Sequence, residues 1–209
     1  MSDSVSASTR KAGAPADDLT DFVAGVATQV ETFLLALREI ARAESPDQSV
    51  SLLLLEVSQV MLAGGRLGAI ADVVPDDRWE PDVGPDPDLD ELRDRLGVLL
   101  EPIDEYVAVF DPYAADTELV HTRLSDDLAA VAAALAHGLR HYKDDRVNEA
   151  LWWWQFSYLN SWGSHAGMAL RALHSVVAHS RLDTPADDTV EFEDRLLAEV
   201  AAEALETDR

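Results

Sequence analysis

The chain contains one strongly aromatic stretch, Leu151-Trp152-Trp153-Trp154-Gln155-Phe156-Ser157-Tyr158-Leu159-Asn160-Ser161-Trp162-Gly163. It holds four of the five tryptophans of a protein that is only 7% aromatic. Successive residues of an α-helix point about 100° apart, so three consecutive tryptophans cover roughly 200° of the helix surface. Such a helix must be enclosed by other elements or must cover a partner. We therefore predict that it forms the centre of the fold.

The segments that flank this stretch predict a helix hairpin. An Ala-rich helix is expected from Leu128 to about Tyr142, with Ser125-Asp126-Asp127 as its cap, and the short turn Lys143-Asp144-Asp145 joins it to the aromatic helix. So short a connection places two helices antiparallel. The aromatic helix is expected to run from Arg146 to about His179, with an irregularity at residues 160–164. Gly163 and Gly167 would let a neighbouring backbone approach closely.

Earlier segments also predict helices. Apolar residues recur with a helical period over residues 19–40 and 89–110, and Leu52-Leu53-Leu54-Leu55 lies in a further helix. Gly64-Gly65 is expected to kink or end that helix, and Pro102 to kink or break the one at 89–110. No stretch shows convincing strand alternation. The sequence thus predicts an all-α fold, a single bundle of five to six helices with a central aromatic-rich helix.

The domain organisation follows from composition. Residues 1–16 are expected to be a disordered tail and residues 17–182 a helical bundle domain. Residues 183–209 form an acidic C-terminal segment that is expected to be helical and loosely attached. Residues 75–88 hold four prolines and read as a loop, in which Trp79 would fold back onto the bundle.

Charge limits the classes of partner. Forty acidic and sixteen basic residues give a net charge of −24. Direct binding to a nucleic acid backbone or to an anionic membrane is disfavoured, because there is no cationic surplus. Basic partners are permitted, although a solvated acidic surface is the commoner explanation for such a charge. Cysteine is absent, and residues 1–15 lack the apolar core of a signal peptide, so we expect a cytoplasmic protein.

Two kinds of candidate site arise from the sequence. An aromatic pocket or partner groove would be built from Trp154, Gln155, Tyr158, Asn160, Trp162 and His165. A metal site would use His137 and His141, four residues apart on one helix face, with Glu149 or His121 as a third ligand. The pairs Glu91/Asp94 and Glu101/Asp104 are alternative ligands for Mg²⁺.

The quoted aromatic block, together with a few shorter segments, resembles the domain-of-unknown-function family 5063 of high-GC Gram-positive bacteria. The segments that carry the resemblance are Asp21-Phe22-Val23, Leu52–Leu55, Asp111-Pro112, His137-Gly138-Leu139 and, most specifically, Trp152–Tyr158 with Trp162-Gly163. The resemblance covers roughly residues 19–182 and carries no catalytic residue over to this chain. Members of the family are often encoded near a recombination mediator protein, which implies an association with DNA repair.

The sequence therefore predicts a non-enzymatic interaction or adaptor protein, and the family resemblance implies an association with DNA recombination or repair. Its expected partner is a protein, with a recombination mediator protein as one candidate. One alternative is a metal-dependent all-α hydrolase that resembles nucleotide pyrophosphohydrolases. Another is a small-ligand-binding protein with an aromatic pocket. No cofactor is predicted.

Overall fold

The computed structural model of the chain describes residues 15–43, 45–75, 84, 88–113, 115 and 119–182. The tail expected at residues 1–16, apart from the backbone at 15–16, lies outside these residues. So do Trp79 and the C-terminal segment 183–209. The elements are α1 (Pro15–Ile40), α2 (Pro46–Ala69), α3 (Asp90–Leu99), β1 (Glu105–Val109), β2 (Leu119–Arg123), α4 (Leu124–Lys143), α5 (Val147–Ser157), a π-helical turn (Tyr158–Trp162) and α6 (Gly163–Leu182).

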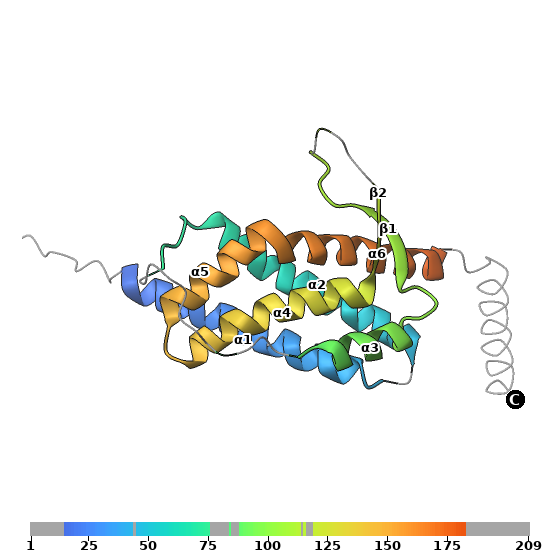
Figure 1. Cartoon of the computed structure of the whole chain (residues 1–209), viewed down its shortest axis with the longest axis horizontal. Coiled ribbons are helices and arrows are strands. Elements are labelled where there is room, and N and C mark those ends of the chain that lie inside the picture. The colour runs from blue at the N-terminus through green and yellow to red at the C-terminus, as the bar shows by residue number, and fades with distance from the viewer. Residues whose placement is uncertain are drawn as a thin grey trace, which may run out of the picture.

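The described part of the chain is mostly helical, as the sequence predicts. The long helices lie side by side along one direction, and the strands β1 and β2 project from their side next to α6 (Figure 1). Helix α2 packs against α1 and α6, and α4 packs against α3, α5 and α6. The contact faces are apolar: Phe33, Leu37, Leu53 and Leu128 are fully buried. Burial of these side chains is the main source of stability for the helices.

The aromatic stretch forms α5, the π-helical turn and the start of α6. Trp154 and Trp162 are fully buried. The Trp154 indole N–H donates to the carbonyl of Leu135 on α4 (3.0 Å), and that of Trp162 donates to the carbonyl of Trp154 (3.2 Å). Helices α4 and α5 thus form the predicted antiparallel helix pair. The π-helical turn accounts for the irregularity expected near residue 160.

Close approaches between helices occur at glycines other than the expected ones. A Cβ atom on Gly64 of α2 would collide with the rings of Tyr158 and Trp162, and one on Gly138 of α4 would collide with the indole of Trp154. A Cβ on Gly163 would collide with the carbonyl oxygen and ring of Tyr158 in the adjoining π-helical turn, not with another helix, and one on Gly167 would meet nothing within 4 Å. Helix α2 also continues through Gly64-Gly65, which was expected to kink or end it. Gly64 and Gly138 therefore leave the space that large aromatic rings of the neighbouring segment occupy.

The helix predicted over residues 89–110 ends at Leu99, so the break expected near Pro102 occurs, but the helical prediction for the residues beyond it is wrong. Pro102 has no N–H to continue a helix, and the chain instead forms β1, which pairs antiparallel with β2. Tyr106 lies opposite Thr122, and Val107 opposite His121. Residues 105–109 (Glu-Tyr-Val-Ala-Val) are rich in β-branched and aromatic side chains, which favour a strand. We name β1, β2 and their connection the hairpin.

The cap expected at the start of α4 is also wrong. Helix α4 begins at Leu124, so Ser125 and Asp127 lie inside its first turn. The capping group is the carboxylate of Asp104, which accepts hydrogen bonds from the Ser125 N–H (2.8 Å) and hydroxyl (2.9 Å). Asp104 is buried and also pairs with Arg123 at 3.2 Å. A carboxylate from a neighbouring segment thereby satisfies the helix terminus.

Two segments, Leu19–Ile40 and Gln48–Ala69, are long and apolar enough to cross a membrane by length and composition alone. Core helices of soluble proteins meet the same criteria. Both segments contribute fully buried side chains to the core, including Phe33 and Leu53. The expectation that the chain makes no membrane contact stays a prediction.

Candidate functional site: a groove between the hairpin and α6

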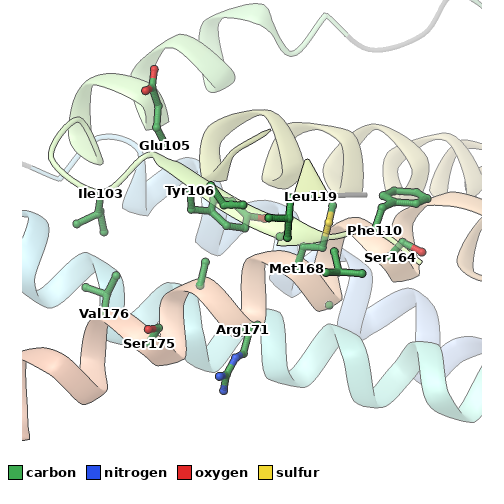
Figure 2. Close-up of a pocket in the computed structure, with 15 residues that line it drawn as sticks. Ile103, Glu105, Tyr106, Phe110, Leu119, Ser164, Met168, Arg171, Ser175 and Val176 are labelled. Atoms are coloured by element: carbon green, nitrogen blue, oxygen red, sulfur yellow. The ribbon is translucent and has the colours of Figure 1, made fainter. Parts of the chain in front are cut away.

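A groove of about 770 Å³ runs between the hairpin and α6 (Figure 2). Its hairpin wall comprises residues 105–110 and Leu119, and its α6 wall comprises Ser164, Gly167, Met168, Arg171, Ala172, Ser175 and Val176. The α6 residues recur every three or four positions, so they share one helix face. Side chains from both walls converge on the interior, while Glu105 and Arg171 extend away from it on opposite sides (Figure 2).

The groove exposes apolar surface to solvent. Val107, Phe110 and Leu119 on the hairpin are exposed, although each is large and apolar. Single exposed apolar side chains are common in soluble proteins, but a contiguous set around a concave surface marks a binding site. Because the set lies on two different elements, its shape depends on how the hairpin is held against the helices.

A buried carboxylate holds the hairpin in place. Asp127, on the first turn of α4, is only 1% exposed. Its carboxylate accepts a hydrogen bond from the Tyr106 hydroxyl of β1 (2.5 Å) and one from the Thr122 hydroxyl of β2 (3.3 Å). It also bonds to Nδ1 of His165 on α6 (2.7 Å). Asp127 therefore joins both strands, α4 and α6 through a single side chain; we call these four residues the Asp127 network.

The network has two further features. The pKa of Tyr106 is raised above its usual value, mainly because the side chain is buried. The hydrogen bond to Asp127 and the negative charge of Asp127 raise it further. The Tyr106 hydroxyl therefore stays protonated at neutral pH and donates its proton to the hydrogen bond with Asp127. The ring of Phe110 contacts His165 edge-on, with ring centroids 5.8 Å apart. The network thus lies directly beside the groove.

Helix α6 has an unusual charge for this molecule. It carries Arg171 and Arg181 and no acidic residue from Gly163 to Leu182, in a chain with a net charge of −24. In the strands of the hairpin, Glu105 is offset by Arg123. The residues that line the groove carry one acidic and one basic side chain, Glu105 and Arg171, so the groove lacks the acidic excess of the whole chain and Arg171 offers a positive charge to negative groups.

Comparison with known proteins identifies the family. The model of the domain of unknown function DUF5063 matches residues 17–179. The chain belongs to this family. The fold resembles the crystal structure of protein BF1032 from Bacteroides fragilis, with a TM-score of 0.59 over 77% of this chain and 93% of that chain. Sequence identity is 19%, so this likeness concerns the fold alone. No curated protein matches the chain.

In this DUF5063 domain the residues of the predicted aromatic pocket lie in different environments. Trp154 and Trp162 are in the core, Tyr158 packs against Gly64 and Gly68 of α2, and Asn160 is exposed. His165 is part of the Asp127 network. None of these side chains lines the groove.

Gln155, the remaining residue of that predicted pocket, caps α2. Its side-chain NH₂ donates to the carbonyl of Leu67 (3.0 Å) and is within reach of that of Ala71 (3.2 Å). Its side-chain oxygen accepts from the Val73 N–H (2.7 Å). Gln155 is buried, so these bonds satisfy backbone groups that water reaches poorly. Its role in the DUF5063 domain is structural.

Gln155→Ala is therefore expected to lower the free energy of unfolding by about 2 kcal/mol, because it leaves several backbone groups of the α2 end without partners. Urea denaturation followed by tryptophan fluorescence measures this loss. Asn160→Ala is the control. Asn160 is exposed in the π-helical turn that follows α5, so its substitution should change the free energy of unfolding by less than about 0.5 kcal/mol. Equal effects of the two substitutions would contradict the capping role.

The predicted metal ligands do not gather into one site. His137 and His141 are neighbours on α4, with ring centroids 5.3 Å apart, but the ring of His137 packs on Trp153 at 4.1 Å. Glu149 is buried on α5. Within the described residues, no three His, Asp or Glu side chains form a group suited to a metal ion. Of the carboxylate pairs, Glu91 binds Arg95 at 2.7 Å and Asp104 caps α4.

The sequence alone predicted neither the groove nor the Asp127 network. Tyr106, Asp127 and His165 lie in three separate segments, and no spacing rule connects them. The usable signal was local: Glu105–Val109 and Leu119–Arg123 are both rich in β-branched residues and flank the Asp111-Pro112 turn. Recognition of this hairpin would have placed it beside the first turn of α4 and hence near Asp127.

Proposed function

We propose that this DUF5063 protein is a non-enzymatic interaction protein whose groove binds an acidic, amphipathic segment of a partner protein. The observation that carries the proposal is the exposed apolar groove, bordered by the acid-free helix α6. Apolar anchors of the partner would fill the groove beside Val107, Phe110 and Leu119. Their burial would supply affinity, as in other complexes in which an amphipathic segment lies in an apolar groove.

Charge selects among possible segments. Arg171 and Arg181 would contact acidic side chains of the partner, because they lie on α6 and no acidic residue of that helix competes for them. The repulsion expected from the net charge of −24 acts mainly over longer distances, where salt screens it with a Debye length of about 8 Å. At contact the local charge dominates, so the groove would prefer acidic segments to basic ones.

The biological setting is part of the proposal. We propose an adaptor role in the cytoplasm that is associated with DNA recombination or repair, with a recombination mediator protein as the first partner to examine. The chain would act through protein contact and not by touching DNA, since the overall acidic surface disfavours phosphate contacts.

The proposal can be tested by site-specific photo-crosslinking of the intact chain in its native host. A photoreactive phenylalanine analogue replaces Leu119, which is 70% exposed in the groove. The matched control carries it at Leu62 of α2, which is 69% exposed and does not line the groove. We expect a discrete crosslinked protein from position 119 only, attached through an acidic, apolar segment.

Arg171→Glu should reduce the yield of this crosslink at least threefold, because it replaces a cation with an anion at the rim of the groove. Equal crosslinking from positions 119 and 62, or a crosslinked segment rich in Lys and Arg, would contradict the proposed mode of binding. A crosslink to a small molecule in place of a protein would identify the groove as a ligand site and would also overturn the proposal.

A further inference from the structure

We infer that residues 183–209 of this chain occupy the groove in the free protein, so that a partner segment must displace them. The inference rests on the proposed function, because it assigns an internal competitor to the same groove. Composition, charge and reach of the chain support it independently.

Composition and charge match the groove. The sequence after α6 contains apolar residues separated by acidic ones over a short interval: Val190, Phe192, Leu196, Leu197 and Val200 alternate with Glu191, Glu193, Asp194 and Glu199. This is the chemistry that an apolar groove accepts when Arg171 lies in its lining and Arg181 lies further along α6. The acidic residues would lie towards α6, the only described α-helix that lacks acidic residues.

The chain is long enough to return to the groove. Helix α6 ends at Leu182, and its groove-lining residues run from Ser164 to Val176. At 1.5 Å per residue the far end of the groove is about 27 Å from Leu182. The eight residues from Leu182 to Val190 span up to about 26 Å when extended. The apolar residues can therefore reach any part of the groove without a change in α6.

Covalent attachment would make this contact effective even at low intrinsic affinity. A segment tethered by a short linker experiences an effective concentration in the millimolar range. A segment with a dissociation constant of about 100 μM would then occupy the groove about nine-tenths of the time. A partner would bind productively only if its affinity or its local concentration exceeded this competition.

The test uses the full chain and a fluorescein-labelled synthetic peptide of residues 183–209 as the probe. In one variant, Phe192→Asp, Leu196→Asp and Leu197→Asp remove the apolar anchors from the chain's own segment. We expect the peptide to bind this variant at least tenfold more tightly than the unmodified chain in fluorescence anisotropy. Adding Leu119→Asp should abolish this gain, whereas adding Leu62→Asp should leave it unchanged.

The outcomes separate the inference from the proposed function. Equal binding of the peptide to the variant and to the unmodified chain would overturn the inference, although the groove would still accept such segments. If Leu119→Asp and Leu62→Asp changed the affinity for the peptide equally, the inference would also be overturned, because the peptide would then bind outside the groove. Absence of binding to both proteins would overturn it as well, and the crosslinks from position 119 would then decide the proposed function separately.

Discussion

Gly138→Val is expected to lower the free energy of unfolding by about 3 kcal/mol or more, the largest effect of any single substitution considered for this protein. A Cβ atom at position 138 would overlap the indole ring of Trp154. That ring is fully buried, and its N–H is bonded to the carbonyl of Leu135 on the same helix as Gly138. The ring can move away only by losing this bond and displacing its neighbours.

Chemical denaturation of Gly138→Val and Gly65→Ala separates packing from helix propensity. Gly65 lies within α2, and a Cβ there meets nothing within 4 Å. Gly65→Ala should therefore stabilise the protein by up to about 1 kcal/mol, because alanine favours a helix over glycine. A stability of Gly138→Val equal to that of the unmodified protein would show that Trp154 does not pack closely against α4.

A double substitution tests the specific contact. Trp154→Leu removes the indole, so Gly138→Val should cost much less in its presence than alone. The difference, expected to be about 1–3 kcal/mol, measures the coupling between the two positions. Additive effects would indicate that position 138 is sensitive for a reason other than the indole.

The helix hairpin of α4 and α5 could be predicted from the sequence for a physical reason. Three adjacent tryptophans cannot all be placed on one side of a helix, and a turn as short as residues 143–146 allows only an antiparallel partner. Both arguments depend on local geometry alone. The helix hairpin of α4 and α5 followed from them, whereas the helices elsewhere were predicted from the helical period of their apolar residues.

The failures occur where local preference is balanced or where contacts are distant. Residues 105–109 fit the apolar spacing of the preceding helix and also suit a strand, and pairing with residues 119–123 decides between them. Asp127 looked like part of a helix cap because Ser and Asp are preferred at the residue that precedes a helix. Its actual partners, Tyr106 and His165, become neighbours only once the hairpin and α6 are in place. Such contacts cannot be derived from spacing along the chain.

Asp127→Ala is expected to lower the free energy of unfolding by about 3 kcal/mol, because it leaves the partners of a buried carboxylate without a hydrogen bond. The Tyr106 hydroxyl and the His165 Nδ1 would lose bonds of 2.5 and 2.7 Å, and Thr122 would lose a weaker one. Asp126→Ala is a matched control from the adjacent position. Asp126 is exposed and lies 3.9 Å from Arg93, so its removal should cost less than about 0.5 kcal/mol.

Hydrogen exchange would show where the stability is lost. A two-stranded hairpin is marginally stable by itself, and the Asp127 network ties both of its strands to α4 and α6. In Asp127→Ala the amides of β1 and β2 should exchange at least tenfold faster, beyond the change in the buried amides of α1 and α2. A uniform increase across all elements would contradict the anchoring role, since it would reflect a loss of global stability only.

The same substitution connects the network to the groove. The hairpin supplies one complete wall, so its release should enlarge and disorder the groove without altering any residue that a bound segment would touch. The labelled peptide of residues 183–209 should then bind at least tenfold more weakly to Asp127→Ala than to Asp126→Ala, each measured together with the three substitutions of the C-terminal segment. Equal affinities would mean that α6 alone binds the segment and that Asp127 serves stability only.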